Sequence, residues 1–315
     1  MKYWLFRLIT VIFVIALVTQ ADARPVVRAA PEDSNTQALF LPFIATSPSP
    51  GPAWLSYINQ MRGLGNLAPL TENPDWSDGD WKHARYMVKN DFIGHEENAS
   101  LPYYTPEGAL SGASGNVMVH TDINLTDEYA IDLWLSGPFH GLGILDPRLE
   151  QTGFSSYREY DGGWQMAAVL DVIRGRTRFP SPETYPVMWP GNQATTPLTT
   201  YAGNESPYPL TSCPGYRAPT GQPVYLILGS GEVTPVVTNH SFLKGGEPVD
   251  HCIFDQTTYS NPYPSYQSYA RSILNSRGAV ILIPRAPLVP GESYSVSITV
   301  NDQTYAWEFF VAANP

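Results

Sequence analysis

The spacing of hydrophobic residues changes about half-way along this 315-residue chain, and this change constrains the fold more than any other feature. Before it, apolar residues recur at helical spacing. Trp54, Ile58 and Met61 share one helical face, and Gly63 and Gly65 then predict the end of that helix. After it, short β-type runs alternate with turns. The chain is therefore expected to contain two regions of different architecture.

Residues 51–175 are expected to form a domain in which helices come first and strands follow. A second helix is predicted at about Ser77–Asn90, and a third after Thr126, a good N-cap residue. Strand-like runs follow at Gly153–Tyr157 and Trp164–Val172. This order is typical of an α+β layer domain.

Residues 207–315 are expected to form an immunoglobulin-like or fibronectin-like β-sandwich. Tyr294, Val296, Ile298 and Val300 alternate with polar residues, which predicts a strand with one buried face. The expected strands are Val224–Leu228, Val233–Thr238, Ala279–Ile283, Tyr294–Val300 and Tyr305–Val311. Residues 176–206 are interpreted as a linker and first edge strand, and the tyrosine-rich run Tyr259–Tyr269 as a long loop.

The N-terminus has the three-part form of an export signal. Lys2 and Arg7 precede the apolar run Leu8–Val18, and small residues at Ala21 and Ala23 suit cleavage. We predict a signal peptide at 1–23 and a Pro/Ser-rich spacer at 24–50, with an uncleaved anchor as the alternative. The apolar run is shorter than a membrane-spanning helix needs. The mature chain is thus expected to be secreted, with no transmembrane segment, and to remain extracellular or on the cell envelope.

The two cysteines bear on disulfide formation, and the net charge limits the classes of molecule that the chain can bind. Export would allow the two cysteines, Cys213 and Cys252, to form a disulfide, and two buried free thiols are the alternative. The net charge is −11 and only 15% of residues are charged. Such an acidic chain has no footprint for nucleic-acid phosphates. The oligomeric state stays open.

Several stretches of the sequence resemble common catalytic motifs, but each lacks a residue or a structural context that the motif requires. The Gly63–Ala68 stretch fits a dinucleotide-loop pattern but follows a helix rather than a strand. Ser114 lacks the last glycine of a nucleophile elbow, and His95 lacks the second histidine of a zincin. No catalytic residue is therefore assigned.

Four of the six histidines lie in the first region, within an ordered series of short motifs. The series is Asn59-x-x-Arg62, Pro69-Leu70, Asn90-x-Phe92-x-x-His95, Trp134-x-x-Gly137-Pro138-x-His140, Leu145-Asp146-Pro147 and Gly153-Phe154. In this order and spacing, residues 51–175 resemble the CAP superfamily (cysteine-rich secretory, antigen 5 and pathogenesis-related, or SCP-like), particularly its bacterial branch. The resemblance implies an α-β-α sandwich with a cleft, in which His95 and His140 match the two cleft histidines.

The chain departs from that family at its acidic positions. Gly115 stands where the family has the glutamate of a G-E-N segment, and Gly137 and Gly143 stand where the motif usually has Ser and Asn. His95 and His140 are candidate ligands for a divalent metal such as Zn²⁺, but two imidazoles fall short of three or four ligands. His83 or Glu97 would supply a third donor, and both are included among the candidate cleft residues.

Three functions remain from the sequence. The first is a non-catalytic exported protein that binds an apolar small molecule, a glycan or a surface partner through the histidine-lined cleft. The second is a secreted metal-dependent hydrolase that uses His95 and His140. The third is a cell-surface adhesion or structural module. A carboxylate within reach of a cleft histidine would favour an enzyme.

Overall fold

The computed structural model describes residues 51–160, 162–177 and 184–314, and we call residues 51–175 the helix-rich region and 184–314 the β-rich region. The predicted signal peptide and spacer lie outside the described residues. The helix-rich region contains, in order, α1 (Ala53–Gly63), β1 (Thr71–Glu72), α2 (Pro74–Lys89), α3 (Pro106–Ser114), β2 (Gly115–His120), α4 (Asp127–Ser136), α5 (Pro138–Ile144), β3 (Gln151–Thr152), β4 (Phe154–Arg158) and β5 (Met166–Asp171).

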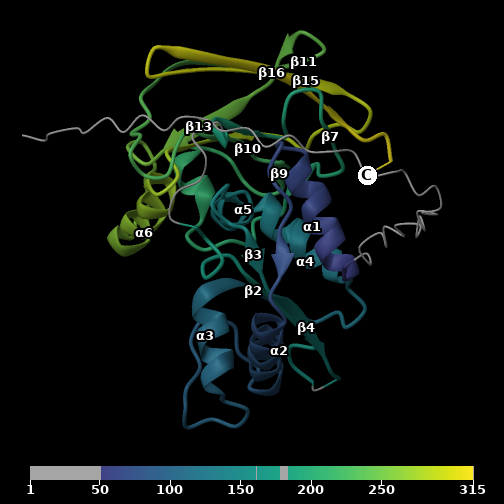
Figure 1. Cartoon of the computed structure of the whole chain (residues 1–315). Helices are drawn as coiled ribbons and strands as arrows, with labels where there is room; N and C mark the ends of the chain where they lie inside the picture. The colour runs from purple at the N-terminus through teal and green to yellow at the C-terminus, as the bar shows by residue number, and fades with distance from the viewer. Residues whose placement is uncertain (1–50, 161, 178–183, 315) are drawn as a thin grey trace, which may run out of the picture. The chain divides into compact units, whose positions relative to one another are not determined.

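A three-stranded antiparallel sheet, ordered β2-β5-β4, forms the centre of this region. Side chains along β5 alternate between its two faces. Met166, Ala168 and Leu170 join a core with α1 and α4, whereas Ala167 and Val169 pack with α2 on the opposite face. Helices therefore cover both faces, with α2 and α3 below the sheet in Figure 1 and α1, α4 and α5 above it. The α-β-α sandwich predicted for this region is confirmed.

Local sequence explains where these helices begin. The side chain of Thr126 accepts a hydrogen bond from the amide of Tyr129, as expected for the N-cap of α4. Asn73 caps α2 in the same way and Pro74 occupies its first position, where a missing N–H costs nothing.

The β-rich region contains two larger, mainly antiparallel sheets that share a core, and a further two-stranded sheet. One sheet has the order β13-β14-β10-β6 and the other β12-β11-β15-β16-β7. The elements are β6 (Val187–Trp189), β7 (Thr195–Thr196), β8 (Thr200–Tyr201), η2 (Pro209–Ser212), β9 (Thr220–Gly221), β10 (Val224–Ile227), β11 (Val237–Lys244), β12 (Glu247–Pro248), β13 (His251–Asp255), α6 (Pro264–Asn275), β14 (Ala279–Pro284), β15 (Ser293–Val300) and β16 (Gln303–Val311). The predicted β-sandwich is confirmed, and the disulfide Cys213–Cys252 ties the segment after η2 to β13.

Two local expectations in this region are wrong. Tyr259 is buried rather than part of an exposed loop, and the run after it forms α6. Pro264 stands at the first turn of that helix, and Ala270 and Leu274 give it a buried face. The strand expected at Val233–Thr238 instead begins at Val237, because Pro235 cannot donate to a sheet ladder.

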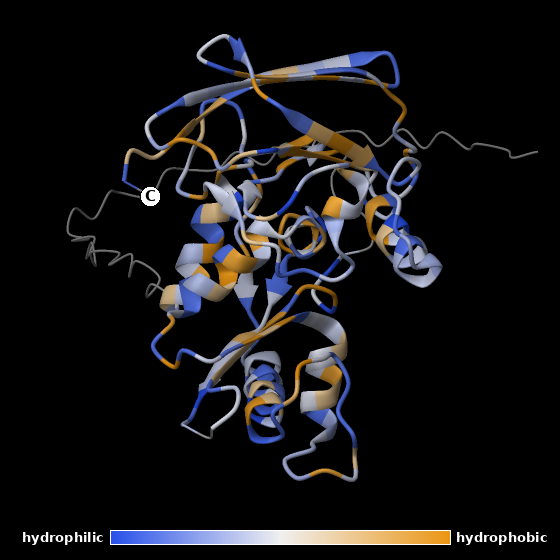
Figure 2. Ribbon diagram, turned by 180° about the vertical axis from the view of Figure 1, so that it is seen from behind, coloured by the Kyte–Doolittle hydropathy of each residue, from blue (hydrophilic) through white to orange (hydrophobic). Residues whose placement is uncertain are grey.

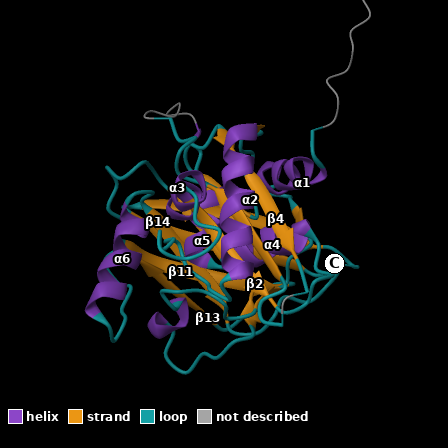
Figure 3. Cartoon of the chain, turned by 90° about the horizontal axis from the view of Figure 1, so that it is seen from below, coloured by secondary structure: helices purple, strands orange, loops and turns teal. Residues whose placement is uncertain are grey.

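The four-stranded sheet is buried on both faces. Val224 and Leu226 of β10 pack into the sandwich, whereas Tyr225 and Ile227 join the core of the helix-rich region. Figure 2 shows hydrophobic residues concentrated on these inner strands, and Figure 3 shows helices lying over the strands. The two described regions accordingly belong to one compact unit. The β-rich region is thus positioned to contribute side chains to a site on the helix-rich region.

Candidate functional site

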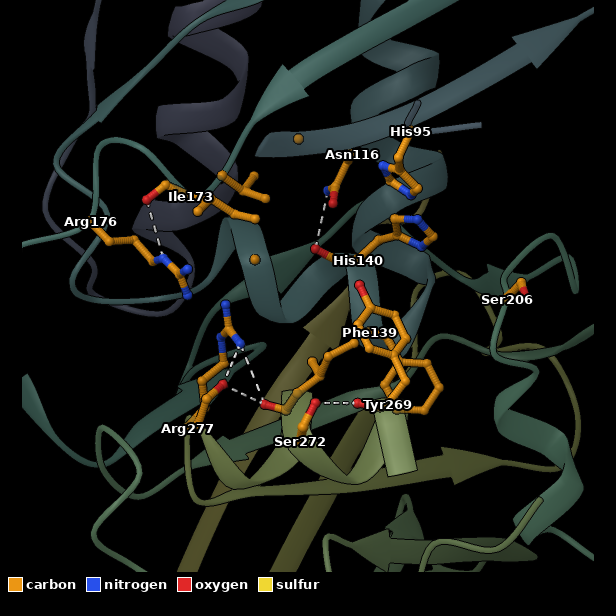
Figure 4. Close-up of a pocket in the computed structure, with 15 residues that line it drawn as sticks. His95, Asn116, Phe139, His140, Ile173, Arg176, Ser206, Tyr269, Ser272 and Arg277 are labelled. Atoms are coloured by element: carbon orange, nitrogen blue, oxygen red, sulfur yellow. Dashed lines mark hydrogen bonds between the residues drawn. The ribbon is translucent and has the colours of Figure 1, made fainter. Parts of the chain in front are cut away.

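A cavity of about 320 Å³ lies between the helix-rich region and α6, and we call it the interface cavity. Its walls come from both regions: from the loop after α2, from β2 and α5, from the turn after β5, and from α6. The lining residues are His95, Gly115, Asn116, Phe139, His140, Gly143, Val172, Ile173, Arg176, Ser206, Tyr269, Ser272, Ile273, Ser276 and Arg277. Figure 4 shows the two imidazole rings on one side of this cavity and the two guanidinium groups on the other.

His95 is held by a backbone contact that leaves one ring nitrogen for the cavity. Its Nδ1 lies 2.9 Å from the carbonyl oxygen of Gly112, so Nδ1 carries the proton and donates. His95 remains exposed, but the surrounding atoms partly desolvate its ring and lower its pKa. The neighbouring His140 and His83 lower this pKa further. The ring is therefore mainly neutral at neutral pH, with Nε2 as a lone-pair acceptor.

His140 is held by an acid that comes from beyond the helix-rich region. Oε1 of Glu205 lies 2.6 Å from Nδ1 of His140, and it also accepts hydrogen bonds from the amides of Phe139 (2.9 Å) and His140 (2.7 Å). The Glu205 side chain is 1% exposed, whereas that of His140 is 20% exposed. No hydrogen bond joins Nε2 of His140 to any described residue, so this nitrogen is available to a bound molecule.

His83 and Glu97 do not belong to this cavity, contrary to the expectation from the sequence. Nδ1 of His83 lies 3.0 Å from Oε1 of Glu97, and both side chains are completely buried. Nε2 of His83 donates to the carbonyl oxygen of Gly94 at 2.9 Å. Both ring nitrogens are thus engaged, and Glu97 also accepts from the amide of Thr105. This pair fastens the loop after α2 to the start of α3 and leaves no atom for a ligand.

Comparison with known proteins agrees with this architecture. Residues 55–169 match the model of the cysteine-rich secretory protein family, CAP. The chain carries a CAP domain. None of the curated proteins matches the chain. Among solved structures, an outer surface protein from Borrelia burgdorferi aligns at 19% identity over 37% of this chain and 86% of its own, with a TM-score of 0.28.

Two glycines stand where the sequence comparison with the CAP family expects larger side chains, and the structure gives a steric reason for each. A Cβ atom at Gly115 would lie 2.5 Å from the carbonyl oxygen of Leu170 on the paired strand, so no larger side chain fits there. A Cβ atom at Gly137 would lie 2.9 Å from Oε1 of Glu205. The absence of a side chain at Gly137 makes room for the carboxylate that reaches His140.

The residues of the interface cavity do not fit a zinc site. Only His95 and His140 offer ring nitrogens there, and the lining includes no Asp, Glu or Cys. Within residues 51–160, 162–177 and 184–314, no group of three or more such side chains is arranged to hold a metal ion. Zn²⁺ sites in proteins use three or four protein ligands.

A second cavity, of about 290 Å³, shares His140 with the first. Most of its other lining side chains are apolar or aromatic, namely Ile93, Val117, Met118, Val119, Tyr129, Leu133, Trp134 and Trp164. His140 therefore forms a wall common to two cavities, one mixed and one mainly apolar.

Sequence reasoning missed Glu205, α6 and the two cavity arginines. Glu205 lies 65 residues after His140 in a polar loop with no periodicity, so no local pattern marks it. Arg176 and Arg277 are 101 positions apart by their numbering and are brought together only by folding (Figure 4). The helical spacing of Ala270 and Leu274 after Pro264 was the one available signal for α6.

Proposed function

We propose that this protein is an exported, non-catalytic binding protein that holds a small molecule with an apolar body in the interface cavity. The observation that carries the proposal is the cavity itself. It has the size of a small-molecule site and a mixed lining, in which apolar side chains stand beside polar ones that include two imidazoles and two guanidiniums. Glu205 and Gly112 fix the orientation of the two rings, which favours pre-organised recognition.

Export is supported by two independent features. The N-terminal sequence has the form of a cleavable signal, and the Cys213–Cys252 disulfide suits an oxidising compartment. In the part of the chain that the structure describes, no helix has the length and hydrophobicity of a bilayer-spanning segment. We expect the mature chain to begin at Arg24, which mass spectrometry of the secreted protein would test.

Binding is tested by calorimetric titration with octan-1-ol, a neutral molecule with a flexible apolar body. Ser272 is exposed on α6 and lines the cavity, so Ser272→Trp would fill it. Asn275→Trp is the matched control, since this exposed residue of the same helix does not line the cavity. We expect at least tenfold weaker binding in Ser272→Trp and unchanged binding in the control. Equal binding of octan-1-ol by all three proteins, or binding of neither octan-1-ol nor octanoate by the unmodified chain, would contradict the proposal.

The contact between Glu205 and His140 favours a hydrolase as the second candidate. A carboxylate at 2.6 Å from Nδ1 is how general-base histidines are oriented, leaving Nε2 to activate a nucleophile. No described hydroxyl is hydrogen-bonded to that Nε2, so water would be the nucleophile. Release of p-nitrophenol from p-nitrophenyl butyrate by the unmodified chain and by His140→Gln separates the candidates. The binding proposal predicts equal background rates, and a rate lost in His140→Gln would support the hydrolase.

A further inference from the structure

Three arginines surround a single carboxylate at one end of the interface cavity. Arg148 holds Asp146 with two hydrogen bonds, Nε to Oδ1 at 2.9 Å and Nη2 to Oδ2 at 2.7 Å. Nε of Arg277 lies 3.2 Å from Oδ2 of Asp146, and Nη1 of Arg176 lies 3.8 Å from it. Asp146 is completely buried, and although burial alone would raise its pKa, Arg148 and Arg277 lower it overall. Asp146 is therefore ionised at neutral pH.

Arg277 has donors that the protein does not use. It is 6% exposed and lines the cavity. Its Nη1 donates to the carbonyl oxygen of Ile273 (3.4 Å) and to Oγ of Ser276 (2.8 Å). Its Nε faces Oδ2 of Asp146 at 3.2 Å, and its Nη2 makes no hydrogen bond to a described residue. Burial lowers the pKa of Arg277 to about 10, so the group remains a cation at neutral pH. Nη2 is therefore the part of this guanidinium group that a bound acceptor can use.

The charges of this cluster do not balance. Three guanidinium groups face one carboxylate, which leaves an excess of two positive charges in a chain whose net charge is −11. Glu232, another acid near Arg148, hydrogen-bonds the backbone of Ser230 at the surface. Among the residues that line the cavity, none is acidic. Arg277 is the most buried of the three cations, and a bound anion would offset the cost of its burial.

Four apolar side chains line the cavity together with the arginines and the histidines. They are Phe139, Val172, Ile173 and Ile273. In Figure 4 the guanidinium groups of Arg176 and Arg277 point toward one another, away from the imidazole rings. An occupant that uses both the charge and the apolar wall must carry an anionic group at one end of a hydrocarbon body.

We propose that Arg176 and Arg277 form a binding site for the anionic head group of an amphipathic ligand whose hydrocarbon body extends toward His140. The site rests on the proposed function, because it assigns a chemical class to the molecule bound in the same cavity. Guanidinium groups bind carboxylates and phosphates alike, so the shared chemistry is a head group with anionic oxygens.

Calorimetric titration of the exported chain at pH 7.4 tests this site with four probes: octanoate, octyl phosphate, octan-1-ol and acetate. We expect octanoate or octyl phosphate to bind at least tenfold more tightly than octan-1-ol, and acetate to bind far more weakly than either. Whichever of octanoate and octyl phosphate binds more tightly identifies the preferred head group as a carboxylate or a phosphate. Octan-1-ol binding as tightly as both anions would overturn the anion site while leaving the proposed function intact. If octan-1-ol and both eight-carbon anions all fail to bind, the proposed function fails.

Variants of the two arginines test whether they cause the preference for the anions over octan-1-ol. Arg176→Gln removes a partly exposed charge whose nearest carboxylate oxygen is 3.8 Å away, so we expect it to fold. It should reduce the preference for the anion over octan-1-ol to less than threefold, with octan-1-ol binding unchanged. Arg285→Gln removes the same charge from a surface pair with Asp250 outside the cavity and serves as the control. Arg277→Gln is the second variant, used if its thermal unfolding remains cooperative. A full anion preference in Arg176→Gln would overturn the proposal.

Discussion

Two histidines of the CAP domain each meet a glutamate with the same contact but in opposite surroundings, and the second glutamate comes from outside that domain. In the first, Nδ1 of His83 meets Glu97 at 3.0 Å, 14 residues along the chain. In the second, Nδ1 of His140 meets Glu205 at 2.6 Å, 65 residues along the chain. Nε2 of His83 is occupied by a backbone carbonyl, whereas Nε2 of His140 has no described partner and its ring lines two cavities. The partner of Nε2, rather than the carboxylate on Nδ1, separates a structural histidine from one available to a ligand.

Truncation after Thr177 should have the largest effect of the changes that distinguish the two pairs. It removes Glu205 of the second pair and retains His83 and Glu97 of the first. We expect it to abolish cooperative folding. The β-rich region completes the core of the helix-rich region: the indole of Trp189 donates to the carbonyl of Met61 at 2.8 Å, and the hydroxyl of Tyr225 donates to that of Leu135 at 2.8 Å. Thermal unfolding followed by circular dichroism would test this. A cooperative transition in residues 51–177 would show that the two regions fold independently.

Loss of the disulfide should have the next largest effect and should act on the second pair only. Cys213 follows the segment that carries Glu205, and its bond to Cys252 closes a loop with a sequence separation of 39. We expect Cys213→Ser/Cys252→Ser to lower the free energy of unfolding by about 4 kcal/mol in the chain-entropy model. Urea denaturation of the variant and of the unmodified chain provides the measurement. A loss below about 1 kcal/mol would mean that other contacts already hold this segment.

Glutamine substitutions should separate the two glutamates by their roles. Glu97 accepts through both oxygens, so Glu97→Gln leaves one buried donor facing an amide and should cost about 2 kcal/mol of stability. Glu205 accepts only through Oε1, so Glu205→Gln can keep these bonds and should cost less than about 1 kcal/mol. Ligand binding should show the reverse order, weakened in Glu205→Gln and unchanged in Glu97→Gln. Calorimetry and urea denaturation on both variants test this, and the same order in both measurements would count against the distinction.

The helices α1, α2 and α4 and the strands β4 and β5 followed from local sequence, whereas α3, α5, β2 and the site did not. Thr126 marks the start of α4, and the apolar face of Trp54, Ile58 and Met61 marks α1, because caps and periodicity act over a few residues. The availability of each imidazole depends on the partner of its Nε2, which for His83 is the carbonyl of Gly94, and the orientation of His140 depends on Glu205. Such contacts arise from tertiary packing, so sequence reasoning grouped His83 with His140 although their environments differ.

The smallest expected effect concerns pH and His95, the other ring of the cavity. Its folded-state pKa is lowered, mainly by desolvation, so the unfolded chain binds this proton more readily. Stability should therefore fall as pH decreases through the unfolded value of about 6.5 toward the lower folded value, and be unaffected by His95 above that window. Asp132, whose pKa is raised to about 6, acts in the opposite direction.

Comparison with a variant isolates the contribution of His95 from that of Asp132. Melting temperatures between pH 7.5 and pH 5 should fall more in the unmodified chain than in His95→Gln. His120→Gln, at the end of β2 and outside the interface cavity, is the control and should follow the unmodified chain. Parallel curves for all three proteins would indicate that His95 titrates as it does in the unfolded chain.

The NMR signals of the histidines report most directly whether a ligand contacts the histidines of the interface cavity and leaves His83 untouched. In proton–carbon NMR spectra, the Cε1–H signals of His83, His95 and His140 can be followed during titration with octanoate. We predict that the signals of His140 and His95 shift in a saturable way while that of His83 stays in place. Shifts of His83 as large as those of His140, or no saturable shift of either cavity histidine, would contradict the account.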